Sequence, residues 1–325
     1  MKHQGWARWL LVAVVVAALV GPAPAAAQQL LALVTGGTAG VYFPLGGAMA
    51  EIWNARVPGV RVSAQSSGAS IANIQFLAQG QAHLALVQND IAFYAYSGRE
   101  MFLNVTQNKP EPVTAFRGVA MLYPETIQIV TLRGKGIGQV EDLRGKRVVV
   151  GAPASGTEAN ARQILALHSL FYGQIRPDFL SFAAAVDQLR DGQVDASFIT
   201  AGIPTAAVTD LAAQREVVLV PIRDDKFTEL RERYPFYTRQ TVPAGTYRGL
   251  AAPVQTVAVM AMLVARADLS ADLVYNLTKA MWEGLDRLRA AHAQGRNLDS
   301  SRARVGMPIP LHPGAERYYN ERGIR

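Results

Sequence analysis

The glycine- and serine-rich stretch at residues 151–157 has the residue types and the order that bind an anion. It follows an apolar run at residues 148–150, which reads as a buried strand, and a helix is expected over residues 157–170. A strand that enters a helix through glycine and serine leaves backbone N–H groups unpaired at the helix N-terminus, where the helix dipole adds about half a positive charge. Residues 31–42 repeat this order of strand, glycine-rich loop and helix. The sequence therefore predicts two anion-binding loops that face each other across a cleft.

Small polar side chains follow two further predicted strands. A Ser-Ser-Gly-Ala-Ser loop follows the strand at residues 60–64, and Gln88 and Asn89 follow the strand at residues 82–87. Because ligands of an open parallel sheet bind beyond the carboxyl ends of its strands, these loops are expected to line one site. Any one of these residues can instead cap a helix, since Ser, Thr and Asn at a helix start accept hydrogen bonds from free N–H groups. The candidates that the residues alone supply are Thr35, Thr38, Tyr42, Ser66, Ser67, Ser70, Asn73, Gln88, Asn89, Ser155, Thr157 and Thr200.

Glu125 adds a carboxylate to these neutral candidates. It lies between two expected strands, at residues 116–122 and 126–132, and directly follows Pro124. One interpretation is an exposed turn. The other is a group that receives an ammonium or a hydroxyl of the ligand.

The motifs of several enzyme classes are missing from the chain. Residues 151–156 have the glycine spacing of a phosphate-binding loop, but Thr157 and Glu158 follow where the motif needs lysine. The glycines of the loop at residues 36–40, which we call the first loop, lack the G-x-G-x-x-G spacing of a dinucleotide site. No G-x-S-x-G elbow occurs in the chain. The five histidines are scattered, and neither H-E-x-x-H nor a cluster of Asp, Glu and His suggests a metal. We therefore expect no enzyme, no metal and no cofactor.

The N-terminus has the plan of a secretory signal peptide. Residues 1–8 are basic, residues 9–20 are apolar, and residues 22–27 are rich in proline and alanine, which predicts cleavage after Ala27. A retained membrane anchor is the alternative, although the apolar run is short for a hydrocarbon core about 30 Å thick. We expect export to the periplasm.

Composition excludes other classes of protein. The chain has 325 residues, half of them hydrophobic, and it has no cysteine, which excludes disulfides and thiolate metal sites. The net charge of +7 falls to +5 without Lys2 and Arg8 of the signal peptide (7 − 2). The remaining basic residues lack the interleaved aromatic residues of a nucleic-acid site, so no nucleic-acid partner is expected.

The order of the predicted elements indicates two lobes of like topology. Strands and helices alternate over residues 30–96 and again over residues 148–220, which is typical of mostly parallel sheets covered by helices. In each part a helix ends on Leu-x-x-Gly-Gln and a strand begins at once, at residues 76–85 and 188–197. A strand at residues 179–182 belongs to the second series.

The tail is expected to return to the first lobe. It contains an apolar strand at residues 254–265 and a helix at residues 271–293. The chain would then cross between the lobes near residues 133–138 and 246–252, and two crossings form a hinge. The predicted division is a signal peptide at 1–27, one lobe at 28–133 plus 250–325, and the other at 134–249.

Six segments, in order, resemble the TAXI family of TRAP transporter solute receptors. They are Thr-Gly-Gly-Thr-Ala-Gly-Val-Tyr-Phe-Pro-Leu-Gly at 35–46, Ser-Ser-Gly-Ala-Ser-Ile-Ala-Asn at 66–73, Gln-Asn-Asp at 88–90, Leu-Tyr-Pro-Glu at 122–125, Leu-Arg-Gly-Lys-Arg-Val at 143–148 and Gly-Ala-Pro-Ala-Ser-Gly-Thr at 151–157. Tyr-Arg-Gly at 247–249 and Ala-Asp-Leu at 267–269 extend the resemblance into the tail, so that it covers nearly the whole mature chain. The first loop departs from the family pattern, because Thr38 and Ala39 stand where smaller residues are expected. The identity of the ligand is therefore not carried over.

The resemblance implies a type II periplasmic-binding-protein fold, with two α/β lobes of mostly parallel sheet flanked by helices and hinged by two crossovers. It implies a monomeric periplasmic receptor that binds a small organic anion, such as glutamate, glutamine or a dicarboxylate like 2-oxoglutarate. The receptor would dock transiently with TRAP permease subunits in the membrane. The implied ligand-binding residues are Gly37, Thr38, Tyr42, Ser67, Ser70, Asn73, Gln88, Asn89, Glu125, Ser155, Gly156 and Thr157. A sensor of the same fold that signals to a membrane partner is the alternative, and the sequence does not decide between the two.

Overall fold

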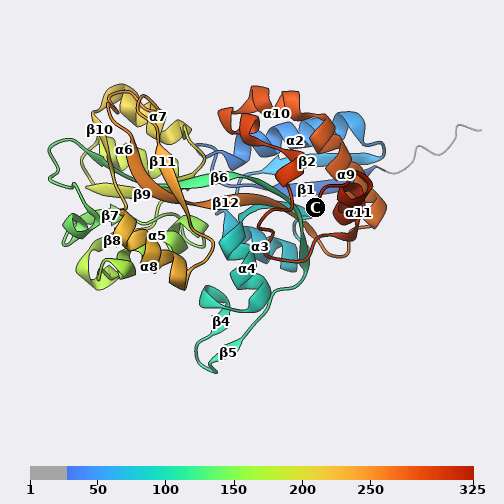
Figure 1. Ribbon diagram of the computed structural model, residues 1–325, viewed down its shortest axis with the longest axis horizontal. Helices are drawn as coiled ribbons and strands as arrows, with labels where there is room; N and C mark the ends of the chain where they lie inside the picture. Colours follow the sequence, from blue (N-terminus) through green and yellow to red (C-terminus); the bar gives the residue numbers. More distant parts are fainter. Residues whose placement is uncertain (1–27) are drawn as a thin grey trace, which may run out of the picture.

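The computed structural model describes residues 28–325, so the expected signal peptide at 1–27 lies outside the described residues. Within the described part of the chain, no helix combines the length and the apolar character needed to cross a membrane. One mixed sheet of ten strands runs through the molecule, with helices on both of its faces (Figure 1). Its main path passes, in spatial order, through β2 (Val60–Gln65), β1 (Gln29–Val34), β3 (Leu84–Gln88), β12 (Val254–Arg266), β6 (Phe116–Leu132), β9 (Ala196–Ala201), β7 (Arg147–Val149) and β8 (Arg176–Asp178). Two strands lie off this path: β10 (Val217–Val220) pairs with β6, and β11 (Thr238–Val242) pairs with β12.

The long strands β6 and β12 join the two lobes (Figure 1). They are antiparallel, with Phe116 opposite Arg266 near one end and Thr126 opposite Ala258 near the other. On either side of this pair the sheet is parallel, since β1 pairs with β2 and β3 in one lobe and β7 pairs with β8 and β9 in the other. The expected α/β fold of two mostly parallel lobes is confirmed, and the lobes share one sheet.

β6 corrects the sequence-based prediction. The two strands expected at residues 116–122 and 126–132 are one strand. Pro124 lies where the register with β12 becomes irregular, a place at which a residue without an N–H is tolerated. Glu125 is therefore a buried strand residue, 3% exposed, and the interpretation as an exposed turn is wrong.

The same strand, β6, connects the two lobes. The first part of β6 pairs with β12, and its second part pairs with β9 and β10 of the other lobe. β6 and β12 thus extend from one lobe into the other, and the crossings near residues 133–138 and 246–252 stay a prediction. The lobe limits at 28–133 plus 250–325 and at 134–249 stay a prediction.

Helices cover both faces of the sheet. In Figure 1, α2 and α10 lie above the strands of the first lobe, and α3 and α4 lie below them. The α-helices of this lobe are α2 (Tyr42–Arg56), α3 (Ser70–Ala78), α4 (Asn89–Ser97), α9 (Ala271–Glu283), α10 (Leu285–Ala291) and α11 (Pro313–Glu321). Those of the second lobe are α5 (Gly156–Leu167), α6 (Phe182–Arg190), α7 (Ala206–Gln214) and α8 (Asp224–Arg233). The connections hold a hairpin and short 3-10 helices: β4 (Leu103–Asn104), β5 (Lys109–Pro110), η1 (Glu100–Phe102), η2 (Val140–Leu143), η3 (Tyr172–Gln174), η4 (Ala293–Asn297) and η5 (Ser300–Arg302).

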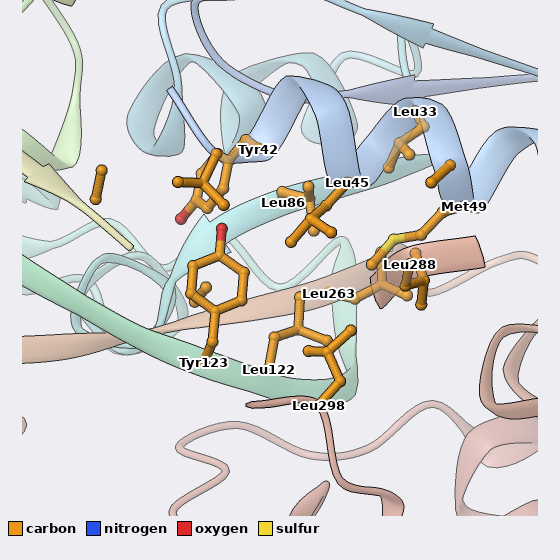
Figure 2. Close-up of a cluster of buried hydrophobic side chains, with 14 of the residues drawn as sticks. Leu33, Tyr42, Leu45, Met49, Leu86, Leu122, Tyr123, Leu263, Leu288 and Leu298 are labelled. Atoms are coloured by element: carbon orange, nitrogen blue, oxygen red, sulfur yellow. The ribbon is translucent and has the colours of Figure 1, made fainter. Parts of the chain in front are cut away.

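The core of the first lobe lies between α2 and the sheet (Figure 2). Apolar side chains of α2, β1, β3 and β12 meet there, and the buried ones include Leu33, Leu45, Met49, Leu86 and Leu263. Burying one such side chain contributes roughly 1.5–3 kcal/mol. This core fixes α2, and with it Tyr42 at the start of α2.

The C-terminal segment returns to the first lobe, as predicted. Trp53 Nε1 on α2 donates a hydrogen bond to the Leu277 carbonyl on α9 (2.8 Å). The single helix expected at residues 271–293 is divided into α9 and α10 at Gly284. A Cβ at Gly284 would lie 2.8 Å from Ile52, so the chain can approach α2 this closely only with glycine.

The segment before α6 differs from the prediction. A strand is expected at residues 179–182, but β8 ends at Asp178 and Ser181 caps α6. The Ser181 Oγ accepts a hydrogen bond from the Ala184 N–H (3.4 Å). Phe182 therefore begins a helix. The elements α8, β11 and α11 have no counterpart in the sequence-based prediction.

Candidate functional site

A cavity lies between the two lobes, at the carboxyl ends of the parallel strands. Its volume is about 80 Å³, which is room for roughly half a dozen water molecules. Both lobes contribute to its wall. The lining residues are Gly36, Gly37, Gly40, Val41, Tyr42, Ser67, Gly68, Ala69, Ser70, Gln88, Glu125, Ala152, Ser155, Gly156, Thr157, Ser181, Phe182, Thr200 and Ala201.

The structure brings most of the predicted ligand-binding residues to this cavity. The two glycine-rich loops predicted to face each other do so across it. The predicted residues that line it are Gly37, Tyr42, Ser67, Ser70, Gln88, Glu125, Ser155, Gly156 and Thr157.

Three predicted residues do not line the cavity. Asn73 supports the loops from behind: its Nδ2 donates to the carbonyls of Thr35 (2.6 Å) and Leu86 (2.8 Å). Asn89 ties α4 to the sheet, because its Oδ1 accepts a hydrogen bond from the Met260 N–H (2.9 Å). Thr38 is exposed and is not among the lining residues. Asn73 and Asn89 thus make structural hydrogen bonds, and their role as ligand contacts stays a prediction.

Four helices begin at the cavity wall. Tyr42, Ser70, Gly156 and Phe182 are the first residues of α2, α3, α5 and α6, and all four line the cavity. Each helix N-terminus contributes the equivalent of about half a positive charge and free N–H groups. No Lys, Arg or His is among the lining residues, so the positive partial charges at the wall are those of backbone N–H groups.

Two buried polar atoms of the wall have no hydrogen-bond partner in the described chain. They are Oε1 of Gln88, at the end of β3, and Oγ1 of Thr200, on β9, and their side chains are 3% and 4% exposed. A buried polar atom without a partner costs about 1–3 kcal/mol. Both atoms are free to bind a water or a polar molecule in the cavity.

Glu125 is the one carboxyl group of the wall. Tyr42 Oη donates a hydrogen bond to Glu125 Oε2 (2.7 Å), and Figure 2 shows the hydroxyl ends of Tyr42 and Tyr123 directed toward each other. Burial raises the pKa of Glu125 to about 8; the hydrogen bond from Tyr42 opposes this shift, and the charge of Asp90 adds to it. Glu125 therefore binds its proton near neutral pH.

The lobes are in direct contact around the cavity. The Ala72 N–H donates to the Ala154 carbonyl (3.1 Å), and the Ala207 N–H donates to the Ala39 carbonyl (3.3 Å). A Cβ at Gly156 would lie 1.8 Å from Gln88 Oε1, so a larger residue there would displace Gln88. These contacts hold the two lobes together around the cavity.

The sequence-based prediction missed some residues of the wall. Phe182 packs against the first loop: a Cβ at Gly40 would lie 3.5 Å from its ring. Ser181 and Phe182 were missed because the segment was expected to be a strand. Thr200 was a candidate from the residues alone, but the resemblance did not include it.

Ser155 both caps a helix and lines the cavity. Its Oγ accepts a hydrogen bond from the Glu158 N–H (3.2 Å) and donates one to the Ala152 carbonyl (2.7 Å). Substitution of Ser155 would therefore cost stability as well as change the wall.

A second set of buried polar groups joins α4 to α5 outside the cavity. Asn160 Nδ2 donates to Asp90 Oδ2 (2.9 Å) and to Tyr237 Oη (2.9 Å), and Tyr237 Oη donates to Gln163 Oε1 (2.7 Å). Asp90 Oδ1 accepts from the Ile91 N–H (2.8 Å). Burial raises the pKa of Asp90 to about 6, against the effect of these hydrogen bonds. We call this set the Asp90 cluster.

No metal site accompanies either set. Over residues 28–325, no group of three or more His, Asp or Glu side chains is placed to hold a metal ion.

Known structures share this architecture. A protein from Bordetella bronchiseptica RB50 superposes with a TM-score of 0.58 at 15% identity, over 91% of this chain and 98% of that one. PhnD1 from Prochlorococcus marinus, in complex with methylphosphonate, gives 0.54 at 10% identity, over 91% and 97% of the two chains. The alkanesulfonate-binding protein SsuA from Xanthomonas axonopodis pv. citri, bound to MOPS, gives 0.50 at 16% identity, over 93% and 96%. At such identities the likeness concerns the fold, which is the two-lobed fold of periplasmic binding proteins.

The sequence itself matches a described family over most of its length. The match covers residues 33–323, which includes both lobes and every residue of the cavity wall. The chain belongs to the NMT1-like family.

Proposed function

We propose that this protein is an extracytoplasmic solute receptor that binds a small organic anion between its two lobes and does not transform it. The observation that carries the proposal is the cavity between the lobes, onto which four helix N-termini open beside the unpartnered Gln88 Oε1 and Thr200 Oγ1. Backbone N–H groups of helix N-termini bind anions without a cationic side chain. One terminus contributes about 0.3–2 kcal/mol, so that several acting together can support micromolar affinity, about −8 kcal/mol.

Two of the similar structures support an anionic ligand. PhnD1 holds methylphosphonate and SsuA holds MOPS, and each of these compounds carries an acidic oxyanion group. We propose the same class of ligand here, with a carboxylate as the acidic group. Glutamate, glutamine and dicarboxylates such as 2-oxoglutarate are the candidates that the resemblance to TAXI receptors supplies.

The partner and the location belong to the same proposal. The signal-peptide pattern of residues 1–27 supports export to the periplasm. There the closed receptor, a monomer, would dock transiently with the membrane subunits of a TRAP-type permease and release the acid. The TAXI resemblance supports this type of permease.

Thr200 and Thr126 provide a test with a matched control. Both threonines are buried and both have an Oγ1 without a partner in the described residues, but only Thr200 lines the cavity. We expect Thr200→Val to weaken binding at least tenfold and Thr126→Val to leave it within twofold, by calorimetry with L-glutamate, L-glutamine and 2-oxoglutarate. Mass spectrometry of compounds that co-purify with the protein widens the search. Equal effects of the two variants, or binding of no organic acid, would contradict the proposal.

A further inference from the structure

We propose that Glu125 acts as a neutral carboxylic acid that donates a hydrogen bond to the carboxylate of the bound acid. The receptor would thus recognise an anion by sharing a proton with it, and a cationic side chain would be unnecessary. The inference rests on the proposed function and names the residue that determines its specificity.

The position of Glu125 carries the first step. Its side chain comes from the middle of β6, is 3% exposed and lines the cavity. Its Oε2 accepts a hydrogen bond from Tyr42 Oη (2.7 Å), and within residues 28–325 its Oε1 has no partner. One carboxyl oxygen is therefore available to a molecule in the cavity.

The charges around Glu125 carry the second step. The titratable groups that act on it are Tyr42 from α2, Tyr123 from β6 itself and Asp90 from α4, and none of these is a cation. The side chains that line the cavity include no Lys, Arg or His. An ionised Glu125 would have no cationic side chain beside it and would compete with a bound anion for the helix N-termini, as well as repel that anion at close range. A proton on Glu125 removes both costs and supplies a donor.

The surrounding helices argue against the other role of Glu125, as a receiver of a ligand ammonium. The N-termini of α2, α3, α5 and α6 open on the same cavity. Their dipoles favour a negative charge and disfavour a positive one. Burial, together with the charge of Asp90, raises the pKa of Glu125 to about 8 against the effect of the Tyr42 hydrogen bond, in agreement with a neutral group at pH 7.

Binding should then depend on pH. Only the fraction of receptor with a protonated Glu125 binds the anion, so that affinity falls about tenfold between pH 7 and pH 9. Above pH 8 the complex should take up about one proton, and at pH 6.5 close to none. The proton passes from solvent to Glu125 and stays on it while the acid is bound.

Three forms of residue 125 test this assignment. Calorimetry uses whichever of 2-oxoglutarate, L-glutamate and L-glutamine binds the mature wild-type protein at pH 7, in two buffers of different ionisation enthalpy. Glu125→Gln keeps a hydrogen-bond donor that does not titrate, so we expect its affinity at pH 9 to exceed that of the wild type about tenfold. Glu125→Ala has no donor, so we expect it to bind at least thirtyfold more weakly than the wild type at pH 7. Melting temperatures show that both variants fold.

The outcomes separate this inference from the proposed function. If Glu125→Gln binds as weakly as Glu125→Ala at every pH, Glu125 works as an anion and the inference is wrong, while anion binding stands. Carbon-13 NMR of the glutamate carboxyl groups, assigned with Glu125→Gln, gives an independent reading. A Glu125 signal that is ionised at pH 6.5 in the free protein also overturns the inference. If none of the three acids binds, the proposed function fails and the assignment fails with it.

Discussion

Two buried carboxyl groups lie where the lobes meet, and their surroundings satisfy them to different degrees. Asp90 accepts a hydrogen bond on each oxygen, from the Ile91 N–H and from Asn160 Nδ2. Glu125 accepts one, from Tyr42 Oη, and within residues 28–325 its other oxygen has no partner. Burial raises the pKa of both groups, to about 6 for Asp90 and to about 8 for Glu125.

The difference in hydrogen bonding indicates a structural role for Asp90 and leaves Glu125 available for the proposed ligand. The Asn160 Nδ2 that donates to Asp90 lies on α5, so this hydrogen bond holds α4 against α5, while Asn160 Oδ1 has no partner within residues 28–325. Glu125 shares its wall with the unpartnered Gln88 Oε1 and Thr200 Oγ1. Most buried polar groups in folded proteins are paired, and the unpaired ones at the cavity are therefore the groups on which the proposed ligand site rests.

The largest effect is expected from breaking the Asp90 cluster. Asn160→Ala removes the amide group that donates hydrogen bonds to Asp90 and to Tyr237. The buried Asp90 carboxylate then lacks its side-chain partner. We expect the free energy of unfolding to fall by about 3 kcal/mol at pH 7, measured by urea denaturation. Thr200→Val is the comparison from the cavity, and we expect it to change the same quantity by less than about 0.5 kcal/mol, because its hydroxyl has no partner to lose. A similar loss in both variants would remove the distinction.

The second largest effect is expected from a substitution in the cavity wall. Gly156→Ala places a Cβ 1.8 Å from Gln88 Oε1 and 2.4 Å from Gln88 Cδ, so that Gln88 has to move into the cavity or the lobes have to separate. We expect the affinity for the acid to fall about 100-fold, equivalent to about 2.7 kcal/mol, by calorimetry. Gly173→Ala is the control, because a Cβ there meets no atom within 4 Å. Unchanged affinity in Gly156→Ala would show that the lobes close differently.

A third prediction separates the two carboxyls by pH. The folded-state pKa of Glu125, about 8, lies above its ordinary value of 4.5, so its contribution to stability is complete below pH 4.5 and is lost as the pH rises through 8. Asp90 contributes in the same direction, between its ordinary value of 3.8 and about 6. Between pH 6 and pH 8, we therefore expect the free energy of unfolding of the wild type to fall by about 2 kcal/mol relative to Glu125→Gln. Urea denaturation of the two proteins at pH 6, 7 and 8 measures the difference, in which the histidines cancel.

The pH series has an outcome that would contradict the titration of Glu125. A constant difference between wild type and Glu125→Gln over pH 6–8 would mean that Glu125 does not titrate in that range. The contrast with Asp90 would then rest on hydrogen bonding alone.

The loops of the cavity can be predicted from the sequence because glycine and serine between a strand and a helix act on the local backbone conformation. The start of α2 at Tyr42 and that of α5 at Gly156 follow from such loops. Local pattern does not decide which polar side chain faces the cavity. Asn73 and Gln88 look alike in the sequence, but Asn73 bonds to two carbonyls behind the loops and Gln88 faces the wall.

The remaining errors have physical causes of the same kind. Pro124 indicates a break between two strands because proline lacks the N–H of a ladder, and the irregular pairing with β12 that accommodates it is a tertiary property. The Asp90 cluster joins residues 70 and 77 positions apart in the chain, at Asn160 to Asp90 and Asn160 to Tyr237. No periodicity or motif reports a contact of that kind.

The smallest effect is expected at the rim of the cavity, where an apolar contact and no polar group closes the lobes. The Phe182 ring packs against the first loop at Gly40, across the junction, and is half-buried. We expect Phe182→Ala to weaken binding about fivefold, equivalent to about 1 kcal/mol of lost packing, with an unchanged pH dependence. Phe179→Ala is the matched control from the same lobe, because Phe179 is 41% exposed and contacts Tyr172 edge to face at 5.9 Å. If calorimetry shows equal losses in the two variants, Phe182 acts on the stability of its lobe. A change in pH dependence would instead mean that Phe182 controls the access of water to Glu125, which would bring the rim and the buried carboxyl into one functional unit.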